Sequence, residues 1–185
     1  MAIMMGNDQQ DAIRNKNVAQ LTYENDYQFA KAPSPPKVTA VPGDGKVTLY
    51  WDRSAESTQD KYMGNITDGA DLYDFEGYKI YRATDFEFND AYNITDGDGN
   101  PTFLEPYVQN GVRAQWDLVD GKSGWHPVDL NGIKFYLGDD TGLTHSYVDH
   151  NVVNGQRYYY AVVSYDYGGD LSNNIIPSDS PMKLR

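Results

Sequence analysis

One stretch near the C-terminus constrains the fold of this chain more than any other. Residues 154–167, NGQRYYYAVVSYDY, are rich in aromatic and β-branched side chains. The stretch begins with Asn-Gly and is followed by Gly168 and Gly169, so turn-forming residues bound it at both ends. Apolar side chains fall on both faces, with Tyr158, Tyr160 and Val162 on one and Tyr159, Ala161 and Val163 on the other. This pattern predicts a central β-strand of a sandwich, buried on both faces.

Composition narrows the class of protein. The chain has 185 residues, enough for one domain with large loops or one domain with an arm. It has no cysteine, so it forms no disulfide. Its net charge of −12 argues against a nucleic-acid partner, because binding phosphates requires a basic surface. No apolar run approaches the ~20 residues of a membrane span. The first residues, MAIMMGNDQQ, do not resemble a signal peptide, which leaves open whether the native chain starts further upstream.

The N-terminal part predicts a helical arm. Residues 7–28 carry an imperfect helical stripe made by Ala12, Ile13, Val18, Ala19 and Leu21. The stripe is too weak to stabilise an isolated helix. Residues 30–36, AKAPSPP, contain three prolines, which exclude helix and keep the backbone extended. We therefore predict an arm with a proline-rich linker over residues 1–34, and a β-domain over residues 35–185.

The β-domain contains further strands with clear alternation. We predict strands at residues 38–41, 46–52, 75–82 and 146–149, and a last strand from Ile175, Ile176 and residues 180–184. Residues 53–74 are polar and predict a long irregular loop. Residues 83–143 form the largest insertion, and a loop of that length predicts extra hairpins. Its strand candidates are residues 114–119 and 133–137, and Trp116, Trp125 and Phe135 predict a small core within it.

Four segments, in order, resemble a fibronectin type III domain. They are the proline-led residues 35–38, VTLYW at 47–51, YKIYR at 78–82, and residues 154–162. Tyr158 matches the tyrosine corner of that family, in which the phenol hydroxyl bonds back to the upstream backbone. The resemblance implies an all-β, immunoglobulin-like antiparallel β-sandwich, here with long inserted hairpins and a short N-terminal helical arm. The implied core residues are Trp51, Tyr78, Ile80, Tyr158, Tyr160 and Val162.

The resemblance covers about half of the chain, and the connections around residues 53–74 and 83–143 are longer than those of the family. Domains that combine such features are similar to modules of large secreted or surface-anchored bacterial proteins. An extracellular or cell-surface location is therefore what the resemblance implies.

A glycine-rich acidic run admits two interpretations. Asp96, Asp98 and Asn100 alternate along DGDGN and offer the oxygen ligands that Ca²⁺ prefers. An EF-hand loop starting at Asp96 would need an acidic residue at its twelfth position, which is Tyr107. The other interpretation is a hairpin turn, in which Asp-Gly and Asn are favoured by the backbone alone.

The insertion also contains two tryptophans. Together with the tyrosines of the insertion, Trp116 and Trp125 predict an aromatic platform for sugar rings, or else a satellite hydrophobic cluster under a long loop. The three histidines lack metal-ligand spacing, and no nucleophile-elbow or phosphate-loop motif is present. We therefore expect the chain not to be an enzyme.

These observations lead to three functional hypotheses. The first is a non-catalytic extracellular structural, adhesive or assembly module that acts through protein–protein contacts. Its N-terminal arm is expected to dock onto a neighbouring domain or onto another copy of the chain. The second is a carbohydrate-binding accessory module. The third is a Ca²⁺-stabilised spacer of a larger secreted protein.

Overall fold

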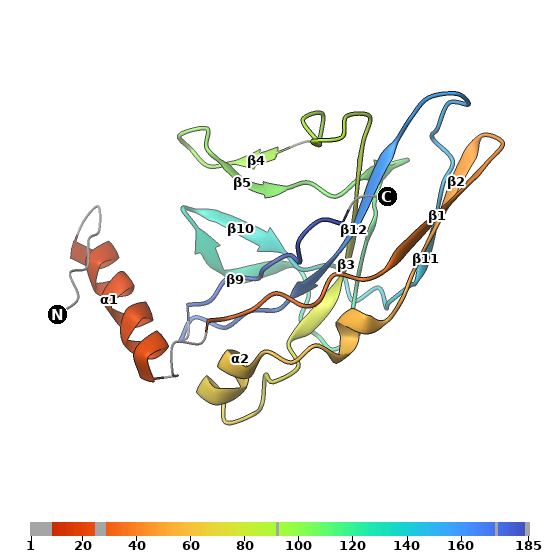
Figure 1. Ribbon diagram of the computed structural model, residues 1–185. Helices are drawn as coiled ribbons and strands as arrows, with labels where there is room; N and C mark the ends of the chain where they lie inside the picture. The colour runs from red at the N-terminus through yellow and green to blue at the C-terminus, as the bar shows by residue number, and fades with distance from the viewer. Residues whose placement is uncertain (1–8, 25–28, 92, 173, 184–185) are drawn as a thin grey trace.

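The computed structural model describes residues 9–24, 29–91, 93–172 and 174–183, and they form mostly antiparallel β-structure (Figure 1). One three-stranded sheet has the order β1 (Val38–Gly43), β2 (Lys46–Trp51) and β11 (Ser146–Asp149). A second has the order β12 (Tyr159–Asp166), β3 (Phe75–Ala83) and β8 (Gln115–Asp117). The predicted all-β class is confirmed, because antiparallel strands make up most of the regular structure.

The two three-stranded sheets share one hydrophobic core. Five of the residues that the family resemblance implied for the core are buried in a single cluster, namely Trp51, Tyr78, Ile80, Tyr160 and Val162. They come from β2, β3 and β12, so both sheets contribute. The Trp51 and Tyr78 rings meet edge-on at 5.8 Å between centroids. Strand β2 alternates as its sequence requires, with Leu49 and Trp51 buried and Lys46 and Tyr50 exposed.

The aromatic strand β12 is covered on both faces. It pairs with β3 along its whole length. On the face opposite the main core, Ala161 and Val163 pack with Tyr81, and Tyr165 packs with Phe135 and Leu137. On its other edge, β12 meets the C-terminal segment through a bridge between Tyr165 and Asp179. The apolar residues on both faces of this stretch are explained by these layers.

The predicted last strand is wrong. Residues 175–176 form no strand, and within residues 180–183 none is found either. Instead, the C-terminal segment joins β12 at the single bridge of Asp179, and the Ser180 N–H donates to the Ser164 carbonyl at 2.8 Å. Pro177 and Pro181 lack the N–H that a longer ladder needs, which explains the short contact. Residues 184–185 lie outside the described residues.

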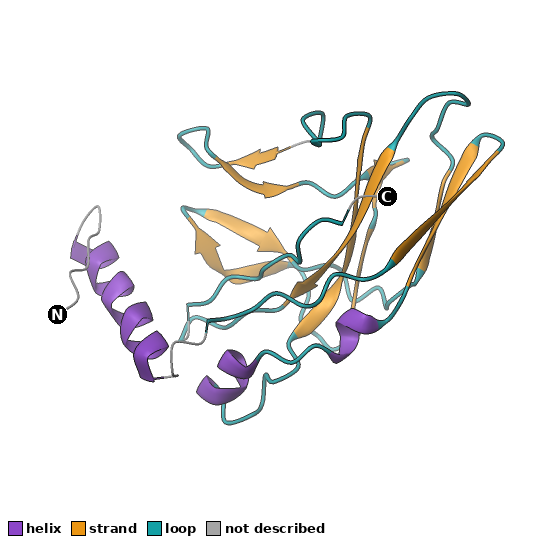
Figure 2. Ribbon diagram, in the orientation of Figure 1, coloured by secondary structure: helices purple, strands orange, loops and turns teal. Residues whose placement is uncertain are grey.

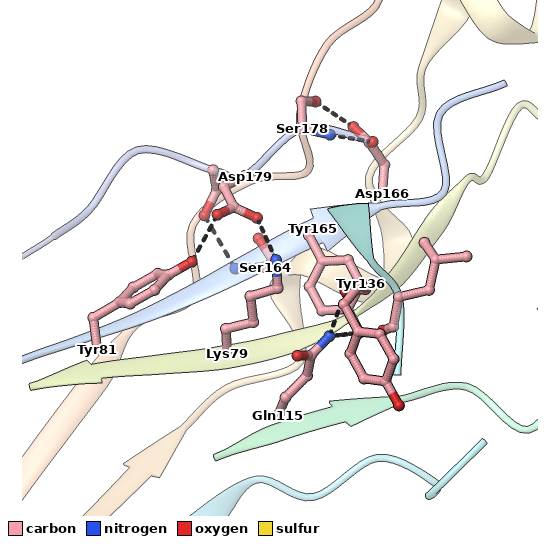
Figure 3. A network of polar contacts seen from close by, with 11 residues as sticks. Lys79, Tyr81, Gln115, Tyr136, Ser164, Tyr165, Asp166, Ser178 and Asp179 are labelled. Atoms are coloured by element: carbon pink, nitrogen blue, oxygen red, sulfur yellow. Dashed lines mark hydrogen bonds and ion pairs between the residues drawn. The ribbon is translucent and has the colours of Figure 1, made fainter. Parts of the chain in front are cut away.

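The C-terminal segment is fastened mainly by side chains (Figure 3). The Lys79 ammonium lies 3.3 Å from an Asp179 carboxylate oxygen, and the Tyr81 hydroxyl donates to the other oxygen at 2.8 Å. The Asp166 carboxylate accepts the N–H and the hydroxyl of Ser178, at 2.7 and 2.5 Å. These bonds replace the missing backbone ladder.

Residues 53–74 are more ordered than an irregular loop. They contain a 3₁₀ turn, η1 (Ser54–Ser57), and a short helix, α2 (Lys61–Ile66). Asp60 caps α2 by accepting the N–H groups of Tyr62 and Met63 at 2.8 and 3.0 Å. Both of these residues are buried. The prediction missed the helix because one short turn carries no measurable helical period.

The long insertion folds into hairpins, as predicted. The three pairs are β4 (Asn93–Thr95) with β5 (Pro101–Leu104), β6 (Val108–Gln109) with β7 (Val112–Arg113), and β9 (Trp125–Leu130) with β10 (Ile133–Tyr136). The turns at residues 110–111 and 131–132 are both Asn-Gly with positive φ, as tight hairpins require. The predicted separate core of the insertion is wrong. Trp116 packs against the main core, Phe135 packs in the cluster with Tyr165, and Trp125 is exposed.

Within the predicted arm, the described residues form helix α1 (Gln9–Glu24), and residues 7–8 and 25–28 lie outside the described residues. Figures 1 and 2 show α1 set apart from the sheets. The segment of residues 31–37 is bonded to the β-domain: the Lys31 N–H donates to Asp60 at 2.5 Å, and the Ser164 hydroxyl donates to the Ser34 carbonyl at 3.0 Å. The predicted boundary at residue 34 falls inside this segment. Neither α1 nor α2 is long and apolar enough to cross a membrane.

Candidate binding cleft

A cleft of about 550 Å³ opens beside strands β8, β10 and β11, with the β6–β7 hairpin on one side. This volume lies within the range of about 300–1,000 Å³ that is usual for small-ligand sites. The side chains that line it are aromatic or polar for the most part, and include Gln109, Arg113, Gln115, Trp116, Tyr136, Asp139, Thr141 and Tyr147. It therefore combines aromatic and polar groups in one concave site.

Three aromatic side chains line the cleft, each from a different strand. Trp116 of β8 rests on the core residue Trp51, with 5.9 Å between ring centroids. Tyr147 of β11 meets the Trp116 ring at 5.5 Å and 60°. Tyr136 of β10 is supported from outside the cleft by Trp125, at 5.0 Å. All three cleft aromatics are half-buried, so each ring is held by the protein and still presents surface.

The buried side chain of Gln115 fixes the base of the cleft. Its amide nitrogen donates to the carbonyls of Tyr136 and Leu137, at 2.9 and 2.8 Å, and so ties β8 to β10 (Figure 3). A β-bulge interrupts the β9–β10 register between Lys134 and Tyr136. Successive side chains of a strand point to opposite faces, so Phe135 of β10 enters the cluster with Tyr165 while Tyr136 lines the cleft.

Asp117, which is fully buried, shapes the loop at the cleft edge. Its carboxylate accepts the N–H groups of Asp140 and Thr141, both at 2.7 Å, and the Thr141 hydroxyl at 2.8 Å. Gly138 has φ of 142°, and a Cβ there would lie 2.3 Å from an Asp117 carboxylate oxygen. Glycine is therefore required at this position, and the loop is held by one buried side chain.

The charged groups of the cleft are paired with neighbours. The Arg113 guanidinium donates to Glu105 at 2.7 Å and lies over the Tyr136 ring, 5.0 Å from its centroid. The Tyr136 hydroxyl donates to Asp139, and this bond raises the pKa of Tyr136. The cleft thus presents aromatic surface and hydrogen-bonding groups, with its charges balanced locally.

The two predicted platform residues do not share one surface. Trp116 lines the cleft, but Trp125 does not; its side chain is 58% exposed and lies on the other side of Tyr136. The structure therefore does not bring Trp116 and Trp125 to one cleft. Tyr136, one of the tyrosines of the insertion, lines the cleft with Trp116, and sequence reasoning missed only Tyr147 of this aromatic lining. Strand alternation alone gave no signal that these three strands converge.

The acidic run at residues 96–100 forms the turn of the β4–β5 hairpin. The Asp96 carboxylate accepts the N–H groups of Asp98 and Asn100, at 3.0 and 2.9 Å, and also the Asn100 side-chain amide at 3.2 Å. These bonds lower the pKa of Asp96. The geometry is that of a turn stabilised by its own aspartate, and the proposed Ca²⁺ ligation remains a prediction.

Buried carboxyl groups lie on β3, on β12 and just before β3. Asp74, Glu76 and Asp166 are each at most 5% exposed. Burial raises the pKa of Asp74 and of Glu76 to about 8, and the nearby charges of Asp166 and Asp120, respectively, add to the effect. Burial raises the pKa of Asp166 to about 7, although its bonds from Ser178 oppose the shift. Among the described residues, no group of three or more acidic or histidine side chains is placed to hold a metal ion.

The buried carboxylate of Asp149 holds neighbouring strands together. Asp149 is fully buried and accepts the Arg82 guanidinium at 3.0 Å and the Tyr160 hydroxyl at 2.8 Å. Tyr158 has the predicted corner bond, because its hydroxyl accepts the Val153 N–H at 3.0 Å. These contacts join β3, β11 and the start of β12, so they act on the frame rather than on a ligand.

Comparison of the chain with models of known protein families, with curated proteins and with solved structures finds no match.

Proposed function

We propose that this chain is a fibronectin type III-like module of an extracellular or cell-surface bacterial protein, and that it acts without catalysis by contacting neighbouring domains or other copies of itself. The fold part of the proposal is supported by two three-stranded sheets around one core and by the corner bond of Tyr158. A fold of this kind supports many functions, so the function must be argued from a surface.

The arm is the surface that supports an assembly role. Ala12, Ile13 and Ala19, the apolar α1 residues whose side chains the structure describes, belong to none of the three buried clusters of the β-domain. Large apolar side chains of the arm are exposed instead: Ile13 by 44%, Tyr23 by 64% and Phe29 by 68%. The base of the arm is fixed by the bond from Lys31 to Asp60. An arm that carries exposed apolar side chains and leaves from a fixed base is suited to docking on another domain or copy.

Deletion of residues 1–30 tests this role. The truncated chain starts at Lys31, whose nitrogen stays beside Asp60, so the attachment of residues 31–37 is preserved. We expect light scattering to give a multiple of the monomer mass for the full chain and the monomer mass for the truncated one, with the same urea midpoint for both. Equal assembly states would contradict the arm as the connector.

A further inference from the structure

We propose that the cleft beside β8, β10 and β11 is a carbohydrate-binding site, and that it takes uncharged sugar residues of an oligosaccharide chain. This inference goes beyond the assembly role proposed for the arm. It rests on residues of the β-domain and on none of the arm, so either proposal can fail alone.

The aromatic lining of the cleft suits the faces of a sugar ring. Trp116, Tyr136 and Tyr147 present ring surface from three strands in one cleft. A pyranose ring has C–H groups on its faces and hydroxyls around its edge. Its faces pack against aromatic rings, while its hydroxyls reach hydrogen-bonding groups at the margin. The volume of about 550 Å³ accommodates a ligand of this kind.

The charged side chains of the cleft are already paired, and this favours an uncharged ligand. Arg113 is paired with Glu105, and Asp139 accepts the Tyr136 hydroxyl. An anionic ligand would have to compete with Glu105 and approach a chain with a net charge of −12. A neutral polyol meets neither obstacle and can hydrogen-bond to the side-chain amide of Asn110, which also lines the cleft and is exposed.

The walls are held before any ligand arrives. Gln115 ties β8 to β10, Trp116 rests on Trp51, and Asp117 fixes the loop that ends at Thr141. A site whose walls are already in place loses little conformational freedom on binding, which favours affinity. The cleft is thus built on the same frame that forms the core.

Titration calorimetry of the full chain tests the proposal. The probes are neutral hexasaccharides of β-1,4-linked glucose, xylose, mannose and N-acetylglucosamine, together with a proline-rich peptide, because such peptides also bind aromatic grooves. Tyr136→Ala removes a cleft ring that belongs to none of the buried clusters. Tyr50→Ala is the matched control, because Tyr50 is a strand tyrosine, 51% exposed, outside the cleft.

We expect at least one oligosaccharide to bind the wild-type chain and the Tyr50→Ala variant equally, and to bind Tyr136→Ala about tenfold more weakly. Tyr136→Phe should retain most of the affinity, because it keeps the ring and loses only the bond to Asp139. The proposal is overturned if no oligosaccharide binds, if Tyr136→Ala binds as tightly as Tyr50→Ala, or if only the proline-rich peptide binds. Urea midpoints of the variants show that each remains folded.

Discussion

Removal of the Asp179 side chain should destabilise the protein far more than removal of its partner, Lys79. The Lys79 side chain is 5% exposed and its ammonium lies 3.5 Å from the Phe135 ring centroid, whereas the Asp179 side chain is 30% exposed. Burial lowers the pKa of Lys79, and the Asp179 carboxylate opposes this shift. Loss of Asp179 therefore leaves a buried cation without its counter-charge, whereas loss of Lys79 leaves a carboxylate that water can still reach.

The expected free energies follow from these contacts. Removing one partner of a buried pair costs about 3–5 kcal/mol, and the exposure of Asp179 places this pair at the lower end. The Tyr81 hydroxyl also loses its acceptor, which costs about 1 kcal/mol or more. We expect about 4 kcal/mol for Asp179→Ala. Lys79→Met should cost only about 1 kcal/mol, because the new side chain still packs on Phe135 and Tyr165.

Urea denaturation followed by fluorescence measures both free energies of unfolding. The double variant Lys79→Met with Asp179→Ala closes a mutant cycle, and it should be more stable than Asp179→Ala alone because the unpaired cation is gone. If Asp179→Ala costs no more than Lys79→Met, the pair does not hold the C-terminal segment onto β3 in the way that the bonds indicate.

Three further predictions concern other parts of the fold. Three buried carboxyl groups keep their protons to higher pH in the folded than in the unfolded state: Asp74, Glu76 and Asp166. The stability that these protonated groups contribute to the fold is therefore lost as the pH rises through about 7 to 8. The free energy of unfolding, and with it the Tm, should fall as the pH rises from about 5 to about 8, by up to ~1.4 kcal/mol per pH unit for each extra proton that the folded state holds, and Glu76→Gln should flatten this profile; a Tm that rises over this range would be contrary to the assigned shifts. Asp60→Ala should lower the free energy of unfolding by about 2 kcal/mol in urea denaturation, because it removes the cap of α2 and the bond from the arm segment; an unchanged midpoint would exclude this role. The Tm should be equal in excess Ca²⁺ and in EGTA, because the Asp96 carboxylate is already bonded within its turn; a higher Tm in Ca²⁺ would restore the calcium interpretation.

Much of the β-structure could be predicted because its signals are local. The alternation around Trp51 and the aromatic run that contains Tyr160 each specify which side chains enter the core. The expected hairpins of the insertion also form, at turns where Asn110-Gly111 and Asn131-Gly132 adopt the positive φ values that such turns need.

The errors in the predicted fold have a common physical cause. Helix α2 is a single short turn set by the cap of Asp60, so it leaves no periodic pattern in the sequence. The C-terminal segment contains apolar residues such as Ile175 and Ile176, yet side chains far away in the sequence fasten it to β3, notably Lys79. Contacts between distant residues are not visible in local periodicity.

The candidate site could be predicted only in part for the same reason. Trp116 stood out in the sequence as a rare aromatic residue in a polar insertion. Tyr136 and Tyr147 are unremarkable in a chain with 16 tyrosines, and only the folded arrangement brings them to one cleft. Trp125 stood out as clearly as Trp116, but the β9–β10 pairing places it across from Tyr136, outside the cleft.

The role of the arm is tested most directly by sedimentation equilibrium of the full chain over a range of concentrations. Ile13→Asp places a charge on the arm, and Val41→Asp makes the same kind of change on β1, at a site of nearly equal exposure, 47% against 44%. We predict that the wild-type chain and the Val41→Asp variant associate with rising concentration and that the Ile13→Asp variant stays monomeric. Association of Ile13→Asp at the wild-type level, or its loss in Val41→Asp alone, would contradict assembly through the arm.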